Sequence, residues 1–184
     1  MPELLRQPLE SPAAWRGEDL DQQQDWIYSL TASQLHELEE GLERTRQSGR
    51  ALSEIRAENF PLPSFATCRE RILHDMEGGR GFAVLRGVPV ERYRPEDAAA
   101  IFWALGAQLG IAEPQDRAGH LLHHVRDTGR NLVSEDNVRK YQTNQDIPFH
   151  NDGSDILMLL CLRDSKSGGR SRLVSATTVF NQII

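Results

Sequence analysis

The sequence predicts an α+β fold, with helices in the first 110 residues and short strands after residue 140. Apolar side chains recur at every third or fourth position in three segments before Gly110, and this spacing is typical of helices with one buried face. After Tyr141 the apolar segments are short and bounded by Gly, Pro, Asn and Asp, which favours strands joined by turns. A chain of 184 residues is long enough to bury one core, and nothing in it requires a second.

Composition and charge exclude several classes of protein. The net charge of -6 and the pI near 5.5 argue against nucleic-acid binding, which requires a basic surface. The longest apolar run, residues 156–162, is too short to cross a bilayer, and residues 1–6 lack the basic start and apolar core of a secretory signal. Only Cys68 and Cys161 are present, so no disulfide framework is indicated and a reducing, cytoplasmic location is expected.

The amino-terminal part of the chain predicts an irregular segment followed by a helix. Residues 1–30 are polar and contain scattered prolines, and Trp15 and Trp26 are expected to tether this segment to the rest of the fold. Thr31 and Gln34 have the spacing of a capping box at the start of a helix, and Gly49 supplies its stop. The apolar face of this helix is expected to carry Leu35, Leu38 and Leu42.

Two more helices are predicted between residues 60 and 110, with a strand between them. Four apolar residues at helical spacing are expected to be core residues of the first helix: Phe65, Cys68, Ile72 and Met76. Residues 81–87 form an apolar run between glycines and predict a short buried strand. Pro95 is expected in the first turn of the next helix, which ends near Gly110, because its missing N–H costs nothing there.

Short strands and one final helix are expected in the rest of the chain. The predicted strands are residues 120–125, 141–143, 147–150, 155–162 and 172–175. The final helix is expected over residues 176–184. It ends on two isoleucines without a cap or a polar tail, so the chain is expected to be cut in mid-fold.

Three histidines lie close together in the segment 120–125. As a strand, this segment would place His120 and His124 on one side and His123 on the other. A zinc site made by these three histidines is one hypothesis, and it predicts that metal is retained after His150→Ala. With no Cys or carboxylate recognised at ligand spacing nearby, half-buried strand histidines near a pocket are the preferred interpretation.

His150 and Asp152 are the main candidates for chemistry. They are two residues apart at the expected end of a strand, so both side chains are expected on the same face. An imidazole, a carboxylate and a further histidine from elsewhere would form the set of donors that holds Fe(II) and leaves positions open. A His-x-Asp match alone is weak evidence, since chance predicts roughly 0.4 matches in this composition. The alternative is a strand-end histidine hydrogen-bonded to an Asp that caps the following turn.

Five ordered blocks of sequence resemble one family. They are residues 81–90, 102–110, 148–155, 159–163 and 166–171. Together they are similar to the amino-terminal half of the TauD/TfdA-like dioxygenases, which depend on non-haem Fe(II) and 2-oxoglutarate. The resemblance covers roughly residues 60–184. It divides the chain into an irregular and helical extension, residues 1–60, and a truncated dioxygenase domain, residues 61–184.

The resemblance implies a fold, an activity and site residues. The fold would be a partial double-stranded β-helix, or jelly roll, with helices packed outside. His150 and Asp152 match the first two iron ligands, and Ser171 falls where a hydroxyl helps to hold 2-oxoglutarate. The implied reaction uses O2 to convert 2-oxoglutarate to succinate and CO2 while a small organic substrate is hydroxylated. Gln142 and Asn144, just before the metal motif, are hypothetical substrate-pocket residues; the alternative for them is a hydrogen-bonded loop pair.

Two parts of the family's site are not matched in this sequence. The third iron ligand, a histidine, and the arginine that pairs with 2-oxoglutarate are expected beyond residue 184. Two hypotheses therefore follow. In the first, the chain is a fragment of an active oxidoreductase. In the second, it is a truncated and inactive relative that acts as a binding or structural protein, and the 184 residues as written are expected to be inactive.

Overall fold

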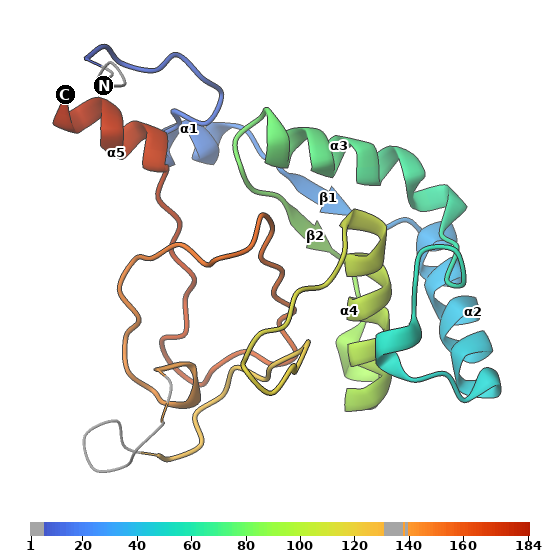
Figure 1. Cartoon of the computed structure of the whole chain (residues 1–184). Coiled ribbons are helices and arrows are strands. Elements are labelled where there is room, and N and C mark those ends of the chain that lie inside the picture. Colours follow the sequence, from blue (N-terminus) through green and yellow to red (C-terminus); the bar gives the residue numbers. More distant parts are fainter. Residues whose placement is uncertain (1–5, 131–137, 139) are drawn as a thin grey trace. The chain divides into compact units, whose positions relative to one another are not determined.

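The computed structural model describes residues 6–130, 138 and 140–184 as an α+β chain (Figure 1). The described helices are α1 (Gly17–Gln22), α2 (Ala32–Ser48), α3 (Ala66–Glu77), α4 (Pro95–Leu109) and α5 (Ala176–Ile183). The chain forms two compact units: the first unit contains Met1–Ile111 and Met158–Ile184, and the second unit contains Ala112–Leu157. None of the described helices is both long and apolar enough to cross a bilayer.

A two-stranded parallel sheet lies in the first unit, made by β1 (Ile27–Ser29) and β2 (Val84–Arg86). Tyr28 is opposite Leu85, and the backbone N–H of Leu30 donates to the carbonyl of Arg86 at 2.8 Å. Parallel strands need a long crossover, and here α2 and α3 supply it (Figure 1). The predicted strand within 81–87 is confirmed at β2. The prediction that residues 1–30 are irregular is wrong at α1 and β1.

The two amino-terminal tryptophans attach this part of the chain to the strand region, as predicted. The indole N–H of Trp15 donates to the carbonyl of Arg80 at 2.8 Å. Trp15 and Trp26 both contact the ring of Phe82, with ring centroids 5.3 and 5.5 Å apart. Aromatic pairs at this separation add to the stabilisation that burial of their area provides.

The ends of α2 follow the sequence signals. The backbone N–H of Gln34 donates to the hydroxyl of Thr31 at 3.3 Å, and the backbone N–H of Thr31 donates back to the Gln34 side-chain oxygen at 2.9 Å. Gly49 ends the helix in the left-handed conformation, with φ at 62°. This conformation favours glycine because a Cβ is strained there. The capping box and the glycine stop are therefore confirmed.

The core of the first unit lies where α2, α3 and α4 pack around the loop that follows α2. Its most buried large side chains are Leu38, Ile55, Phe60 and Ile101. The indole N–H of Trp103 in α4 donates to the carbonyl of Ile55 at 3.2 Å, which satisfies the one polar atom of a buried side chain. Of the four residues predicted as core in α3, Phe65 and Ile72 are buried, whereas Cys68 and Met76 are half-buried.

A buried carboxylate joins α2 to the start of α4. Asp97 lies in the first turn of α4 and accepts hydrogen bonds from two arginines. The Arg46 guanidinium, from α2, contacts its two oxygens at 3.1 and 2.6 Å, and the Arg94 guanidinium does so at 3.3 and 3.0 Å. A negative charge in the first turn is also favoured by the helix dipole. Asp97 is therefore fully paired although it is buried.

The final helix packs against the amino-terminal segment (Figure 1). The hydroxyl of Ser175 caps α5 by accepting from the backbone N–H of Thr178 at 2.9 Å, and it donates to the carbonyl of Ala13. Leu9 and Asn181 exchange two hydrogen bonds, at 2.7 and 2.9 Å. The helix predicted over 176–184 is confirmed as Ala176–Ile183, and residues 9–15 hold it in place.

Five of the predicted strands are not formed. Residues 120–125, 147–150, 155–162 and 172–175 have no assigned strand, and Lys140–Gln142 forms a short 3-10 helix where a strand was predicted at 141–143. A strand must exchange hydrogen bonds with a neighbouring strand. Among the described residues, none of these segments pairs with an assigned strand, so their apolar and β-branched composition does not suffice.

Gly41 in α2 is predicted to tolerate no side chain. A Cβ built at this position would lie 2.3 Å from the Phe60 ring, which is completely buried. Gly41→Ala is therefore expected to lower the free energy of unfolding by about 1 to 3 kcal/mol, measured by urea denaturation. Gly106→Ala in α4 is the matched control, because its Cβ meets only the Met158 sulfur at 3.5 Å. Equal stability of the two variants would contradict this account.

The stability of the first unit is predicted to fall in acid because of Asp97. Hydrogen bonds from Arg46, and next from Arg94, hold the pKa of Asp97 well below its ordinary value of 3.8. The folded chain thus binds this proton less tightly than the unfolded chain, so the stabilisation is present above about pH 4 and is lost as the pH falls toward 2.

Asp97→Asn tests this dependence. The variant is expected to lose about 1 to 2 kcal/mol at neutral pH, since two charge-assisted pairs are weakened and the arginines are partly exposed to solvent. Its unfolding free energy should then fall less between about pH 4 and pH 2 than that of the unmodified chain. The exposed residue Asp21, changed to Asn, is the control. An unchanged acid slope in Asp97→Asn would reject the role of this carboxylate.

Candidate functional site

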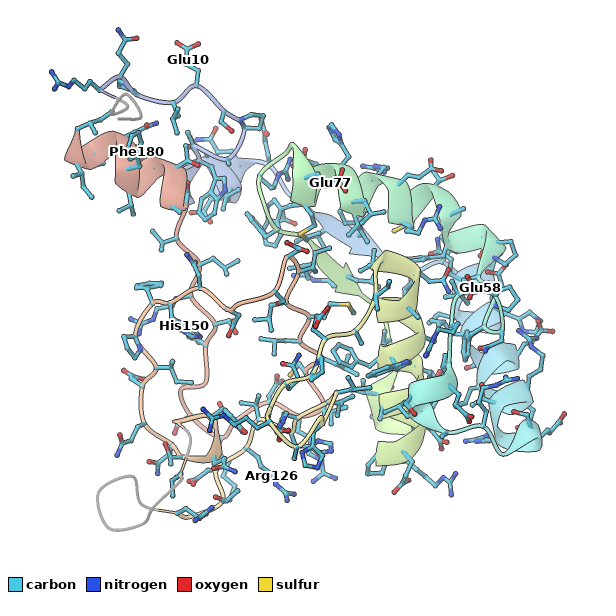
Figure 2. The ribbon with its side chains drawn as sticks, in the orientation of Figure 1. Glu10, Glu58, Glu77, Arg126, His150 and Phe180 are labelled. Carbon is cyan, nitrogen blue, oxygen red and sulfur yellow. The ribbon has the colours of Figure 1, made fainter. Side chains whose placement is uncertain are left out.

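His150 and Asp152 lie next to each other in the second unit, and His150 is labelled in Figure 2. His150 Nε2 is 3.8 Å from Asp152 Oδ2, and both side chains are about half exposed. The expected strand end is absent, because neither residue is in an assigned strand. Their side chains nevertheless face each other across the intervening Asn151. The separation is too long for a hydrogen bond, so the pair is not the simple hydrogen-bonded turn that was the alternative.

The ring of His150 is oriented by a backbone group. Its Nδ1 lies 2.9 Å from the carbonyl oxygen of Pro148, so the tautomer that carries hydrogen on Nδ1 donates to this carbonyl. Nε2 then carries the lone pair, and it lies 3.8 Å from Asp152 Oδ2. Histidines that bind metals are oriented in the same manner, by a hydrogen bond from the other ring nitrogen.

The two atoms also have a separation that one metal ion can bridge. Donors bound to one ion at about 2.1 Å each are at most about 4.2 Å apart. The 3.8 Å between Nε2 and Oδ2 falls within this limit. An imidazole and a carboxylate both suit Fe(II). The residues present therefore fit a metal ion, and further donors would have to complete its coordination.

The remaining residues predicted for the site are more dispersed. Gln142 is half-buried at the end of the 3-10 helix, and its backbone carbonyl accepts from the N–H and the hydroxyl of Thr128, both at 2.8 Å. Asn144 is exposed two residues later. Ser171 is exposed and belongs to the first unit, whereas the other predicted site residues belong to the second.

A second group of possible metal ligands lies in the second unit. The sequence predicted its two histidines as candidates but not its carboxylate. Asp116, His120 and His123 each offer a ligand atom, and these atoms lie within 4.8 Å of one another. The expectation that no carboxylate lies at ligand spacing is wrong, because Asp116 precedes His120 by four residues. His124, the third histidine of the zinc hypothesis, is exposed and is not in this group. The spacing Asp-x-x-x-His, from Asp116 to His120, was the signal in the sequence that could have indicated this group.

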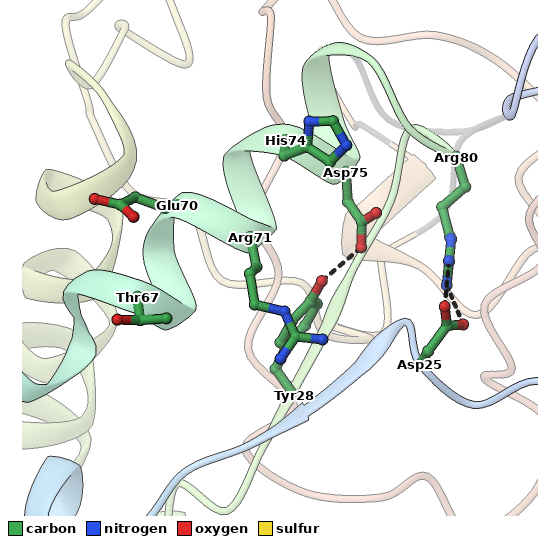
Figure 3. Close-up of a pocket in the computed structure, with 8 residues that line it drawn as sticks. All are labelled: Asp25, Tyr28, Thr67, Glu70, Arg71, His74, Asp75 and Arg80. Carbon is green, nitrogen blue, oxygen red and sulfur yellow. Dashed lines mark hydrogen bonds and ion pairs between the residues drawn. The ribbon is translucent and has the colours of Figure 1, made fainter.

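The first unit contains an open hollow of about 380 Å³ beside α3 (Figure 3). Two pairs of its polar side chains are hydrogen-bonded to each other. Arg80 forms two hydrogen bonds to Asp25, at 2.7 and 2.9 Å, and the Tyr28 hydroxyl donates to Asp75 at 2.7 Å. Burial, and next the hydrogen bond to Asp75, raises the pKa of Tyr28 to about 12. These contacts tie β1 to α3, and no residue predicted for the site lines this hollow.

The fold and the His150–Asp152 pair together describe an α+β chain with a candidate mononuclear metal site. Comparison with known families identifies its class. The sequence pattern of the family described as taurine catabolism dioxygenase TauD, TfdA family, matches residues 45–183. The chain therefore belongs to the TauD/TfdA family of dioxygenases, and the resemblance seen in its sequence is confirmed.

Two curated proteins are similar to the chain. It is 29% identical over 184 residues to FR-33289 synthase of Streptomyces rubellomurinus, an alignment that covers 100% of this chain and 54% of that protein. It is 23% identical over 182 residues to the taurine hydroxylase-like protein SAT17 of Stachybotrys chartarum, covering 96% of this chain and 47% of that protein. The chain thus spans about half the length of the curated relatives it matches.

Proposed function

We propose that the chain is part of an Fe(II)- and 2-oxoglutarate-dependent dioxygenase that hydroxylates a small organic substrate. In this reaction O2 supplies one oxygen atom to the substrate and one to succinate, and 2-oxoglutarate loses CO2. The observation that carries the proposal is the family match over residues 45–183, within which the His150–Asp152 pair lies. The alternative, an inactive relative with a binding or structural role, is not favoured by these comparisons.

His150 and Asp152 are proposed to hold the iron. When bound, Fe(II) would supply the redox chemistry with O2 that no side chain can perform. The protein's own contribution is to orient the donors. The Pro148 carbonyl accepts from His150 Nδ1 and so keeps the Nε2 lone pair free, while Asp152 adds a negative charge that offsets part of the charge of the ion.

Three further residues are proposed to bind the organic molecules. Ser171 would donate its hydroxyl to a carboxylate of 2-oxoglutarate, and its exposure leaves this hydroxyl accessible. Gln142 and Asn144 are proposed substrate contacts; the backbone N–H and the hydroxyl of Thr128 both donate to the Gln142 carbonyl and restrict the backbone there. Ser171 is assigned from its place in the family pattern, and Gln142 and Asn144 from their position just before the His150–Asp152 motif.

The proposed domain is a partial jelly roll over residues 61–184, preceded by an extension over residues 1–60. The family match begins slightly earlier, at residue 45 in α2. Burial along residues 156–160 supports extended chain, because Ile156, Met158 and Leu160 are half-buried whereas Leu157 and Leu159 are exposed. This alternation has the two-residue period of a strand.

Free thiols at Cys68 and Cys161 support the proposed cytoplasmic location.

His150→Ala and Asp152→Ala are predicted to weaken Fe(II) binding. Loss of a group that only supports a metal ligand weakens binding by about 10-fold or more. Each of these variants removes one of the two donors, so the Kd for Fe(II) should rise by at least this factor. Anaerobic equilibrium dialysis of the 184-residue chain measures this Kd. His36→Ala is the control, because His36 is an exposed histidine on α2. Fe(II) affinity that is unchanged in both variants would reject the proposed site.

Ser171 is tested by a pair of substitutions that separate the hydroxyl from the backbone position. Ser171→Ala should raise the Kd for 2-oxoglutarate by about 10-fold, the equivalent of one hydrogen bond to a charged group. Ser171→Thr keeps the hydroxyl and should bind 2-oxoglutarate as the unmodified chain does. Calorimetric titration of the Fe(II)-loaded chain gives both values, and equal weakening by Ala and Thr would exclude the hydroxyl as the cause.

Turnover is the decisive test of the proposed activity. A protein with the complete site, supplied with Fe(II), ascorbate, O2 and 2-oxoglutarate, should release succinate, and Asp152→Ala should abolish this release. The measurement is made both on the 184-residue chain and on a hybrid in which the rest of FR-33289 synthase follows residue 184. Succinate from neither protein would favour the inactive alternative.

A further inference from the structure

A carboxylate and two imidazoles converge in the second unit at residues that share nothing with the His150–Asp152 pair. One ligand atom from each of Asp116, His120 and His123 lies within 4.8 Å of the other two. From this juxtaposition we infer that these three residues form a second metal site, which takes a divalent cation of the zinc type. The site goes beyond the proposed oxygenase activity and does not depend on it.

The carboxylate of Asp116 is held in one orientation by the backbone. Its Oδ1 accepts hydrogen bonds from the N–H groups of Ala118 and His120, at 2.9 and 3.1 Å. Its Oδ2 is thereby directed at both imidazoles, 2.7 Å from His120 Nδ1 and 3.2 Å from His123 Nε2. One oxygen thus positions the loop, and the other, which is hydrogen-bonded to His120 Nδ1, lies beside both imidazole nitrogens.

His123 presents a buried nitrogen that lacks a hydrogen bond. Nε2 is excluded from solvent and has no hydrogen-bond partner among the described residues, although Asp116 Oδ2 is close to it. The other nitrogen, Nδ1, is engaged by the Tyr141 hydroxyl at 3.2 Å, and the two rings are in edge contact at 5.6 Å. A buried polar atom without a partner costs free energy, and a metal ion bound to Nε2 removes this cost.

The distances suit a small ion with nitrogen and oxygen ligands. Tetrahedral zinc with bonds of about 2.1 Å places its ligand atoms about 3.4 Å apart. The observed separations of 2.7 and 3.2 Å are shorter than this value, so the donors would move apart to hold an ion. The side chain of His120 is two-thirds exposed, so the fourth position of the ion would face solvent. An ion pair between Asp116 and His120 accounts for the shorter distance, whereas His123 Nε2 lies 3.2 Å from the same oxygen without a hydrogen bond among the described residues.

The metal would cross-link and stabilise a loop in a unit that has little regular structure. Among its described residues, the second unit contains no strand and only the 3-10 helix Lys140–Gln142. The segment after the cluster is connected to this helix by backbone hydrogen bonds, from Arg126 to Tyr141 at 3.1 Å and from Thr128 to Gln142 at 2.8 Å. An ion held by Asp116, His120 and His123 would fix the part of the same loop that precedes these hydrogen bonds. Tyr141 would support this site through its contact with His123. Metal binding then contributes directly to folding.

The test titrates the metal-free 184-residue chain with Zn²⁺ by calorimetry and counts bound metal by elemental analysis. His123→Gln and Asp116→Asn are the informative variants. Asparagine keeps one oxygen for the backbone N–H groups of the loop, so the local fold has its acceptor. Loss of a group that only supports a metal ligand weakens metal binding by about 10- to 100-fold. Each of these variants removes a ligand itself, so the Kd for this Zn²⁺ is expected to rise by more than that. Tyr141→Phe should produce an effect within that smaller range.

Two controls separate this site from the iron site. His124→Ala removes the neighbouring exposed histidine and should leave the Kd unchanged. His150→Ala should keep the Zn²⁺ that His123→Gln loses. The inference is overturned if His150→Ala abolishes all Zn²⁺ binding while His123→Gln retains it, or if the unmodified chain binds no Zn²⁺, which would leave only an ion pair. Circular dichroism of each variant verifies that the helices of the first unit are intact.

Discussion

The pairing of Asp97 with two arginines fixes the arrangement of helices in the first unit. A carboxylate this deeply buried is tolerated only when its charge is compensated, and Arg46 on α2 and Arg94 before α4 both donate to it. The contact fixes the start of α4 against α2, and the apolar side chains of both helices then meet around Phe60. Gly41 permits the Phe60 ring to approach the α2 backbone, because any Cβ there would overlap the ring. Charge and steric fit therefore specify the same packing.

The second unit is organised by polar contacts. Two of its candidate metal ligands have side chains oriented by nearby backbone groups: the Pro148 carbonyl orients His150, and the amides of Ala118 and His120 orient Asp116. Such local hydrogen bonds fix a side chain without a buried core beneath it. The chemistry of the chain is thus concentrated where the backbone, and not apolar packing, determines side-chain position.

Local signals explain why the helices could be predicted and most strands could not. Helix α2 is bounded by Thr31, Gln34 and Gly49, whose contacts are with backbone groups only a few residues away. Both partners of each contact are therefore visible in a short stretch of sequence. A strand depends on a partner that is distant in sequence. Ile27–Ser29 is a strand because it pairs with Val84–Arg86, and nothing in three residues indicates that pairing. Residues 141–143 have strand-forming side chains, and Tyr141 and Gln142 accept backbone hydrogen bonds from Arg126 and Thr128, but neither segment is an assigned strand. The candidate site followed the same rule: His150 and Asp152 are only two residues apart, so the sequence could predict them as a pair, whereas it did not predict the contact between His123 and Tyr141.

The two candidate metal sites are expected to differ in the metal that they select. Fe²⁺ lies near the weak end of the affinity series for divalent metals, so a site with few donors retains it poorly against stronger competitors. Asp116, His120 and His123 already place three donors together, whereas His150 and Asp152 provide two that are both about half exposed. A zinc-type ion should therefore occupy the three-donor cluster first and leave the His150–Asp152 pair available for iron. Selectivity in this chain would follow from the number and preorganisation of donors, because imidazole and carboxylate are common to both sites.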